Sequence, residues 1–323
     1  MSLKVLISAP YMQPVIERFR PVFSDQGIEL VIPTVCERME EEDLLPLIAD
    51  IDGVICGDDR FTELVLASAT KLKVISKWGT GIDSIDRKAC AAKGVAVRNT
   101  PNAFSEPVAD SVLGYMLCFA RRLPWMTNDM REGVWNKIPG FALREATLGV
   151  IGVGAVGKAV VRRAIAFGMR ILGSDIATIS SEFINETKIS MVPLEILLKD
   201  SDFISINCDL NVTSHHLMNG DRFKLVKPTA YLINTARGPI VDERSMIKAL
   251  QEGKLAGAGL DVFEDEPLPG DSPLRKMDHV LLAPHNANSS PEAWERVHLN
   301  TIRNLFEALG ITNAINFDQM LRA

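Results

Sequence analysis

Three polar side chains follow apolar segments in the second half of the chain, and their chemistry is complementary. Arg237 comes shortly after residues 230–234, and His285 comes after residues 280–282. A guanidinium grips a carboxylate through two parallel hydrogen bonds, and an imidazole gains or loses a proton near neutral pH. Glu266 could accept a hydrogen bond from the second ring nitrogen of His285 and stabilise its protonated form. The three types predict a site that holds an anion while a proton moves beside it.

Each of these residues also has a structural interpretation. Arg237 could be a surface ion-pair partner, Glu266 a loop carboxylate ahead of a proline, and His285 a hydrogen-bonded structural histidine. The other histidines compete less well, because they lie in a polar loop, before a strand or on the last helix: His215, His216, His279 and His298.

A dinucleotide site is indicated by Gly152, Gly154 and Gly157, which follow the apolar residues 147–151 at G-x-G-x-x-G spacing. Such glycines allow a tight turn, a close approach of the backbone to a pyrophosphate and close packing of the next helix. The helix predicted over residues 158–167 would aim backbone amides at the phosphates. The glycines alone are a weak signal, because any sharp turn from a strand into a helix can need them.

The cofactor type is predicted from Asp175, which follows the next apolar segment, residues 170–173, about 20 residues after the glycines. A carboxylate there accepts hydrogen bonds from the adenosine ribose and would repel a 2'-phosphate, so we predict NAD rather than NADP. The alternative is a solvated aspartate that caps the next turn. A hydride acceptor, a base and a carboxylate clamp are what the oxidation of a 2-hydroxy acid requires.

Composition limits the remaining classes. A chain of 323 residues is long for one core and predicts two domains. The formal net charge of -6 argues against nucleic acid as a partner, and the lack of an apolar run of about 18 residues argues against a membrane span. The start of the chain has no signal-peptide pattern, and this favours a cytoplasmic protein. Five cysteines without a C-x-x-C pair predict reduced, mostly buried thiols and no metal site: Cys36, Cys56, Cys90, Cys118 and Cys208.

Short apolar segments alternate with helical segments in two series, which is typical of parallel sheets with crossover helices. The first series comprises residues 4–8, 30–33, 53–56, 73–76 and 95–98. The second comprises residues 147–151, 170–173, 203–207, 230–234, 258–260 and 280–282. The connection over residues 126–141, with Trp125 just before it and Trp135 within it, is predicted to be a dimer arm or a surface loop.

The predicted fold class is α/β, with two doubly wound parallel-sheet domains joined by long helices over residues 105–122 and 291–310. A Rossmann-type NAD domain, residues 100–286, is inserted into a flavodoxin-like substrate domain, residues 1–99 plus 287–323. The residues after the last helix are expected to return to the first domain and complete it. Ligands are expected in a cleft between the domains.

The chain resembles the NAD-dependent D-2-hydroxyacid dehydrogenases, in their phosphoglycerate dehydrogenase-like branch, over nearly its whole length. Besides the glycine turn, the resemblance rests on motifs in a fixed order: KWGTGIDSID at 77–86, NTPNA at 99–103, NTARG at 234–238, GLDVFEDEP at 259–267 and PH at 284–285. The resemblance implies that Arg237, Glu266 and His285 are the family's catalytic arginine, acid and histidine. It also implies a homodimer.

The resemblance further implies a set of ligand contacts. Ala155 and Val156 would contact the pyrophosphate, Asp175 the ribose and Asp261 the nicotinamide carboxamide. The other cofactor contacts implied are Thr80, Cys208, Thr235 and Ala236. The substrate carboxylate would be held by a loop made of Lys77, Trp78, Gly79 and Thr80, with Lys77 available to a phosphorylated substrate. A solvated Lys77 and an ordinary loop glycine at Gly79 are the alternatives.

Two departures from the family pattern affect local details: Asn288 stands where a glycine is common, and Asp209 where a proline is common. The first expected substrate pair is D-3-phosphoglycerate and phosphohydroxypyruvate, followed by hydroxypyruvate or glyoxylate. A non-catalytic NADH sensor like the corepressors that resemble this family is one alternative. Formate and phosphite dehydrogenases are another, although formate enzymes carry glutamine at the position of Glu266.

Overall fold

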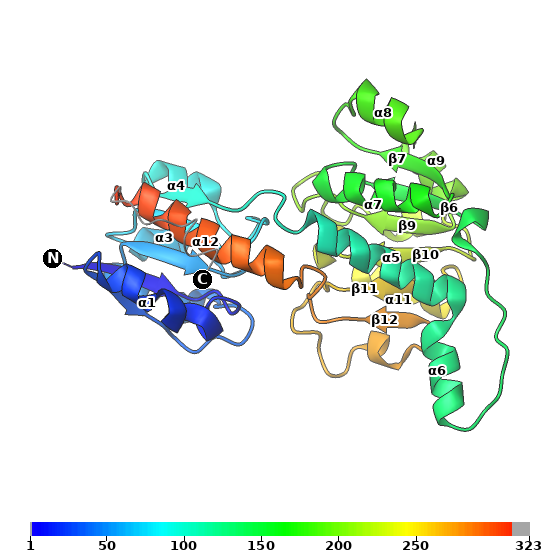
Figure 1. Ribbon diagram of the computed structural model, residues 1–323, viewed down its shortest axis with the longest axis horizontal. Helices are drawn as coiled ribbons and strands as arrows, with labels where there is room; N and C mark the ends of the chain where they lie inside the picture. The colour runs from blue at the N-terminus through cyan, green and yellow to red at the C-terminus, as the bar shows by residue number, and fades with distance from the viewer. Residues whose placement is uncertain (1, 312–323) are drawn as a thin grey trace. The chain divides into compact units, whose positions relative to one another are not determined.

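The computed structural model of the chain describes residues 2–311, which form two compact units (Figure 1). Unit 1 runs to Phe104 and resumes at Ser290, and unit 2 is the continuous stretch between them. These boundaries lie within a few residues of the expected ones. The expected return of the chain to the first domain concerns residues 312–323, which lie outside the described residues.

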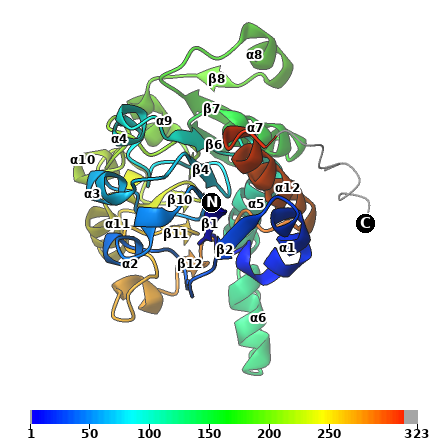
Figure 2. The same ribbon diagram turned by 90° about the vertical axis from the view of Figure 1, so that its left-hand side faces the viewer.

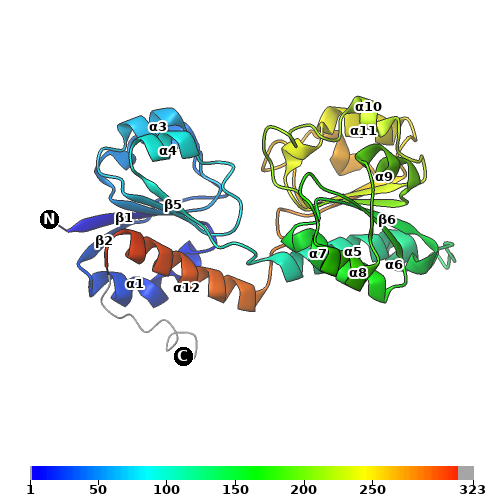
Figure 3. The ribbon, with the colours of Figure 1, turned by 90° about the horizontal axis from the view of Figure 1, so that it is seen from above.

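Unit 1 contains a five-stranded parallel sheet in the order β2-β1-β3-β4-β5, which is the flavodoxin-like order. Its strands are β1 (Leu3–Ile7), β2 (Ile28–Val31), β3 (Gly53–Cys56), β4 (Val74–Lys77) and β5 (Ala96–Arg98). Its helices are α1 (Ile16–Ser24), α2 (Glu41–Leu44), α3 (Glu63–Ser68), α4 (Arg87–Ala92) and α12 (Pro291–Ala308). Helices α1 and α12 cover one face of the sheet, and α3 and α4 cover the other (Figure 2 and Figure 3).

Local sequence explains why α12 begins and packs where it does. Ser290 caps the helix by accepting a hydrogen bond from the amide of Ala293, and Pro291 occupies the first turn, where its missing N–H costs nothing. The helix buries an apolar stripe that includes Leu305. A Cβ added to Gly53 would lie 2.8 Å from Leu305 Cδ1, so this glycine lets the helix approach β3 closely.

Unit 2 contains a seven-stranded parallel sheet in the order β12-β11-β10-β9-β6-β7-β8, the doubly wound arrangement of dinucleotide-binding domains. Its strands are β6 (Thr147–Ile151), β7 (Arg170–Ser174), β8 (Ser190–Met191), β9 (Phe203–Ile206), β10 (Tyr231–Asn234), β11 (Gly257–Leu260) and β12 (Val280–Leu282). Its helices are α5 (Ser105–Arg121), α6 (Leu123–Arg131), α7 (Ala155–Ala166), α8 (Ser181–Thr187), α9 (Leu194–Asp200), α10 (Gly220–Phe223) and α11 (Glu243–Gln251).

Helices α5 and α7 lie on one face of this sheet, and α9, α10 and α11 lie on the other (Figure 3). The order of the strands reverses between β6 and β9, which are parallel neighbours: β7 and β8 follow on one side of β6, and β9 to β12 follow on the other. In open parallel sheets, ligands bind beyond the carboxyl ends of the strands near such a switch point. The topology of the sheet therefore predicts that a ligand site of unit 2 lies at the edge formed by the carboxyl ends of the strands.

Several expectations about local structure were wrong. Strand β8 was missed, because two residues are too few to show a pattern. Strand β2 begins two residues earlier than expected, and β4 ends one residue later. Helix α6, with Pro124 in its first turn, occupies the start of the expected connection over residues 126–141. Only Cys56 and Cys90 are buried, so the thiols are not mostly buried.

No helix within residues 2–311 combines the length and the apolarity that a bilayer span requires. The cytoplasmic location and the homodimer both stay predictions.

The core of unit 2 offers a direct test of packing. The side chain of Phe203 is fully buried and stacks on Tyr231 at 5.3 Å between ring centroids. We expect Phe203→Ala to lower the free energy of unfolding by about 3–5 kcal/mol, because it leaves a cavity in a rigid core. Chemical denaturation followed by circular dichroism measures this. Phe167→Ala is the matched control, because Phe167 is 42% exposed, and it should cost less than about 1 kcal/mol. Equal losses in both variants would contradict the packing described here.

Candidate active site

The predicted site residues of unit 2 follow the carboxyl ends of six strands. These are Gly152 after β6, Asp175 after β7, Cys208 after β9, Thr235, Ala236 and Arg237 after β10, Asp261 after β11 and His285 after β12. All six strands are parallel, so these positions share one edge of the sheet. The sheet thus brings together residues that are more than a hundred positions apart in the chain.

The glycine turn has the geometry that phosphate binding needs. Gly152 has a φ of +85°, and a Cβ there would lie 2.6 Å from the amide nitrogen of Cys208. A Cβ on Gly157 would lie 2.1 Å from the carbonyl oxygen of Gly152, so the third glycine lets α7 approach β6. A Cβ on Gly154, in contrast, would meet nothing within 4 Å. The first and third glycines are required by packing, and the second leaves open space beside the turn.

Helix α7 begins at Ala155, three residues earlier than predicted, with Gly154 as its N-cap residue. Ala155 and Val156 therefore occupy the first turn, whose backbone amides have no partner inside a helix. This position suits the predicted pyrophosphate contact, because the amides and the helix dipole both favour an anion. A further fit comes from Thr235, whose buried Oγ1 has no hydrogen-bond partner within the described residues.

Asp175 is fixed by the turn that it follows. Its Oδ2 accepts a hydrogen bond from the amide of Val153 at 2.6 Å, and its Oδ1 accepts one from Ala177 at 2.7 Å. The capping role that competed with ribose binding is therefore real. The two roles are compatible, because a carboxylate has about four lone-pair positions and these bonds use two. The bond to Val153 orients the carboxylate beside the glycine turn.

His285 and Glu266 form a directly bonded pair. Glu266 Oε2 lies 2.9 Å from His285 Nδ1, and Glu266 Oε1 accepts a hydrogen bond from the amide of Phe263 at 3.0 Å. The side chain of His285 is 20% exposed and that of Glu266 is 16% exposed. Because the carboxylate is an acceptor, Nδ1 carries the proton in this pair and Nε2 is the nitrogen left to exchange protons.

Asp261 holds the chain around His285 in an unusual conformation. His285 has a φ of +48°, a left-handed geometry that a residue with a side chain adopts only when its surroundings impose it. The carbonyl oxygen of Asp261 accepts the amide of His285, and its carboxylate accepts the amides of Asn286 and Ala287 at 2.8 Å each. Burial raises the pKa of Asp261, and these amides oppose that shift. Asp261 was predicted as a nicotinamide contact, and its positioning of the histidine loop was not foreseen.

Arg237 lies on a short loop whose backbone is held by Asn234. The side chain of Asn234 donates to the carbonyl of Arg237 and accepts from the amide of Ala236, and the Arg237 guanidinium donates to the Ala236 carbonyl. A Cβ on Gly238 would lie 1.9 Å from the backbone of Phe263. The loop that carries Arg237 therefore packs directly against the segment that leads to Glu266.

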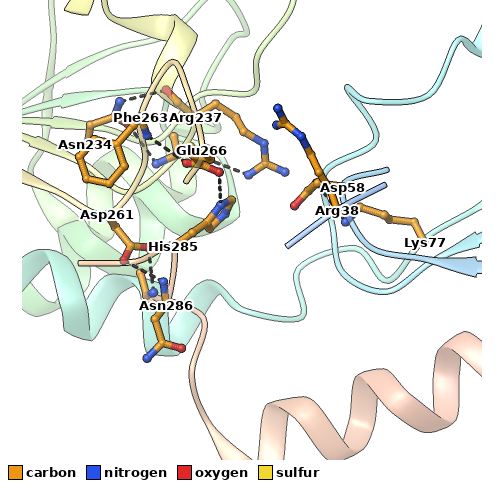
Figure 4. A network of polar contacts seen from close by, with 12 residues as sticks. Arg38, Asp58, Lys77, Asn234, Arg237, Asp261, Phe263, Glu266, His285 and Asn286 are labelled. Carbon is orange, nitrogen blue, oxygen red and sulfur yellow. Dashed lines mark hydrogen bonds and ion pairs between the residues drawn. The ribbon is translucent and has the colours of Figure 1, made fainter. Parts of the chain in front are cut away.

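The three predicted catalytic residues are thus brought together by backbone contacts. Figure 4 shows Arg237, Glu266 and His285 with their side chains directed toward one another. One neighbouring contact was missed: His216, which was predicted to lie in a polar loop, is 2.7 Å from Glu264 Oε1. Only the folded loops bring these two residues together, since 48 positions separate them in the chain.

The predicted carboxylate loop belongs to unit 1. Lys77 is 4% exposed, and its ammonium lies 3.1 Å from Asp58 Oδ1, so the alternative of a solvated lysine does not hold. The side chain of Trp78 is buried, and its indole N–H donates to His298 Nδ1 at 2.9 Å. Gly79 has a φ of +121°, which favours glycine, and Thr80 donates its hydroxyl to the carbonyl of Thr100.

The glycine turn and the Arg–Glu–His group on one doubly wound sheet define the class of a nicotinamide-dependent dehydrogenase. Residues 113–287 match the family model described as D-isomer specific 2-hydroxyacid dehydrogenase, NAD binding domain. The chain belongs to this family, and its cofactor is NAD.

Known relatives support this assignment at the level of sequence and fold. The chain is 40% identical to a glyoxylate reductase of Korarchaeum cryptofilum, over 75% of this chain and 74% of the relative. It is 37% identical to a D-3-phosphoglycerate dehydrogenase of Methanocaldococcus jannaschii, over 90% of this chain but 54% of the relative. A D-lactate dehydrogenase of Aquifex aeolicus, solved with NAD and lactic acid, superposes with a TM-score of 0.86 at 28% identity, covering 97% of both chains.

Two buried titratable groups of unit 1 have pKa values shifted by burial. Burial lowers the pKa of His298 to about 4, which leaves the ring neutral and able to accept from Trp78. Burial raises the pKa of Asp59 to about 6, although hydrogen bonds from the Ser8 hydroxyl and the Met39 amide oppose the shift. Both groups therefore favour their uncharged form when the unit is folded.

The two shifts predict opposite effects on stability in the same pH range. Between about pH 4 and 6.5 the unfolded chain protonates His298 and the folded chain does not, so this residue makes stability rise with pH. Between pH 3.8 and about 6 the folded chain binds the proton on Asp59, so stability falls as pH rises. His298→Gln should therefore make the melting temperature fall more steeply with rising pH, and Asp59→Asn should make it rise more steeply. Thermal melts from pH 4 to 6.5 measure both, and slopes that change in the same direction would contradict the assignment.

Proposed function

We propose that the chain reduces a short 2-oxo acid to its D-2-hydroxy acid with NADH, and catalyses the reverse oxidation with NAD. The observation that carries the proposal is the His285–Glu266 pair, which lies beside Arg237 at the same sheet edge as the glycine turn. Family membership supplies the reaction class. The roles of individual residues and the choice of acid are the proposal.

Arg237 is proposed to hold the substrate carboxylate and to polarise the oxygen that accepts or loses the proton. Its loop is bonded to Asn234 and pressed against Phe263, so the guanidinium starts from a fixed backbone. A planar guanidinium suits this task, because it can bind two oxygens in parallel and stays charged. Such preorganised donors stabilise developing negative charge without rearranging during the reaction.

His285 is proposed to donate its Nε2 proton to the forming hydroxyl during reduction and to remove that proton during oxidation. Glu266 fixes the ring orientation through Nδ1 and stabilises the imidazolium. NAD, when bound, supplies the hydride acceptor or donor. The residues that would hold it are the first turn of α7, Asp175 and the strand-end residues Cys208, Thr235, Ala236 and Asp261.

The identity of the substrate acid is the most specific part of the proposal. Sequence motifs favoured 3-phosphoglycerate, and the glyoxylate reductase and D-3-phosphoglycerate dehydrogenase relatives are similarly identical to the chain, at 40% and 37%. Lys77, the cation expected to be available to a phosphorylated substrate, is paired with Asp58. We therefore propose an unphosphorylated acid such as glyoxylate or hydroxypyruvate as the substrate, with phosphohydroxypyruvate as the competing candidate.

A substrate panel tests the reaction itself. Protein and NADH are mixed separately with glyoxylate, hydroxypyruvate, pyruvate and phosphohydroxypyruvate, and absorbance at the nicotinamide band is followed. We expect oxidation of NADH with at least one acid, and a much slower reaction with NADPH because of the charge on Asp175. A flat trace with all four acids would contradict the proposal and favour the NADH-sensor alternative.

Substitutions at the pair test the assigned roles. His285→Asn should lower kcat by about 10²–10⁴-fold, the usual contribution of a positioned acid or base, while NADH binding measured by fluorescence stays within about twofold. His279→Asn is the matched control, since His279 lies just before β12, at the opposite end of the strand from His285. Full turnover in His285→Asn would reject the role of His285.

Glu266→Gln removes the charge that stabilises the imidazolium and keeps the size of the side chain. The protonated ring becomes less stable, so reduction should lose activity at a lower pH than in the wild type. A pH profile of kcat for reduction measures the shift. An unchanged alkaline limb would show that Glu266 does not act through His285.

A further inference from the structure

The two large side chains of the predicted carboxylate loop are both engaged inside unit 1. Lys77 ends β4, and its ammonium lies 3.1 Å from Asp58 and donates to the carbonyl of Trp78 at 3.3 Å. Only 4% of the Lys77 side chain is exposed, whereas 31% of the Asp58 side chain is. The pair, shown in Figure 4, therefore presents to solvent the carboxylate of Asp58 more than the ammonium of Lys77.

Arg38, the neighbouring cation, is also paired with a carboxylate, which it shares with Arg60. Arg38 Nε lies 2.6 Å from Glu40 Oε1, and the guanidinium of Arg60 lies 3.9 Å from the other oxygen of Glu40. A phosphate group carries a charge of about -1.5 to -2 near neutral pH and is bound tightly by cations that lack a competing anion. Lys77 already faces Asp58, and Arg38 and Arg60 share the carboxylate of Glu40, so a phosphate at these cations would meet repulsion from two carboxylates along with attraction.

Trp78 is fixed by a cluster of rings. Its indole stacks on Tyr11 at 4.8 Å between centroids, contacts Phe104 at 5.6 Å and Trp294 at 6.1 Å, and donates to His298. A tryptophan held on several sides does not move aside for a larger substrate. The side chains of Lys77 and Trp78 thus offer neither a spare cation nor room for a larger substrate, and the amide of Trp78 already donates to the carbonyl of Cys56.

We propose that Asp58 is a specificity-determining residue: by neutralising Lys77 it makes the site select short, unphosphorylated 2-oxo acids over phosphorylated ones. This inference rests on the proposed function, since it concerns the substrate of that reaction. It ranks glyoxylate and hydroxypyruvate above phosphohydroxypyruvate, which was the first expectation from sequence motifs.

The wild-type protein provides the first arm of the test. The kcat/KM for hydroxypyruvate should exceed that for phosphohydroxypyruvate by a factor of about 10 or more. A factor of this size corresponds to the loss of one hydrogen bond to a charged group. A ratio below one, in a protein that oxidises NADH, would overturn the inference and leave the proposed function intact. Inactivity toward every acid would instead reject the proposed function.

The second arm is Asp58→Asn, which keeps the size of the side chain and removes its charge. The freed Lys77 ammonium should raise the relative kcat/KM for phosphohydroxypyruvate by about 10–100-fold. The double variant Asp58→Asn, Lys77→Met should return that ratio toward the wild-type value, because the gain depends on the ammonium. An unchanged ratio in Asp58→Asn would overturn the inference.

A matched control exists in the same sheet. Asp52 and Lys73 form another aspartate–lysine pair at 3.1 Å, at the amino ends of β3 and β4, whereas Asp58 and Lys77 lie at the carboxyl ends. Asp52→Asn should leave the substrate ratio unchanged, because its lysine is remote from the loop. A similar change in both variants would assign the effect to general destabilisation.

Folding of Asp58→Asn is checked by circular dichroism, since the variant loses the partner of a buried ammonium. Should it fail to fold, inhibition of the wild type still decides the matter. Inorganic phosphate is expected not to compete with hydroxypyruvate, and clear competitive inhibition by phosphate would overturn the inference.

Discussion

The parallel direction of all seven strands of unit 2 is the constraint on which its site depends. Parallel strands place their carboxyl ends at one edge, so residues after β6, β7, β9, β10, β11 and β12 meet without any long-range signal in the sequence. The glycine turn occupies the edge beside the switch point, and His285 follows the outermost strand. The glycine turn at Gly152 and the His285–Glu266 pair, which are far apart in the continuous stretch of chain that forms unit 2, thereby lie at the same edge of the sheet.

Buried polar side chains then convert this approximate placement into fixed geometry. The carboxylate of Asp261 accepts the amides of the two residues that follow His285, and Glu266 accepts the amide of Phe263. The side chain of Asn234 bonds to the amide of Ala236 and to the carbonyl of Arg237. Each of these groups is satisfied by main-chain partners, so their burial does not leave unpaired polar atoms. The left-handed conformation of His285 persists because these bonds impose it, and the ring is consequently presented in one orientation.

The two units use charge in different ways. In unit 2 the carboxylate of Glu266 is bonded to a histidine whose charge changes with its protonation, so the pair can take part in proton transfer. In unit 1 the carboxylate of Asp58 forms an ion pair with the ammonium of Lys77, and the two charges compensate each other. We propose that the same type of contact supports chemistry in one unit and selectivity in the other.

The sequence by itself determined the fold class, the glycine turn and the residue types that the sheet brings together at Arg237, Glu266 and His285. It did so because short-range interactions leave a local pattern in the sequence: β3 and β6 were predicted with their observed bounds, since continuous apolar runs mark buried strands. Elements without such a trace, such as the two-residue β8 and the helix α6, were missed. Only the tertiary structure decided what each polar group is bonded to. Asp58 and Lys77, Asp261 and Ala287, and Trp78 and His298 meet through folding of distant segments, and no local pattern records a contact that depends on packing.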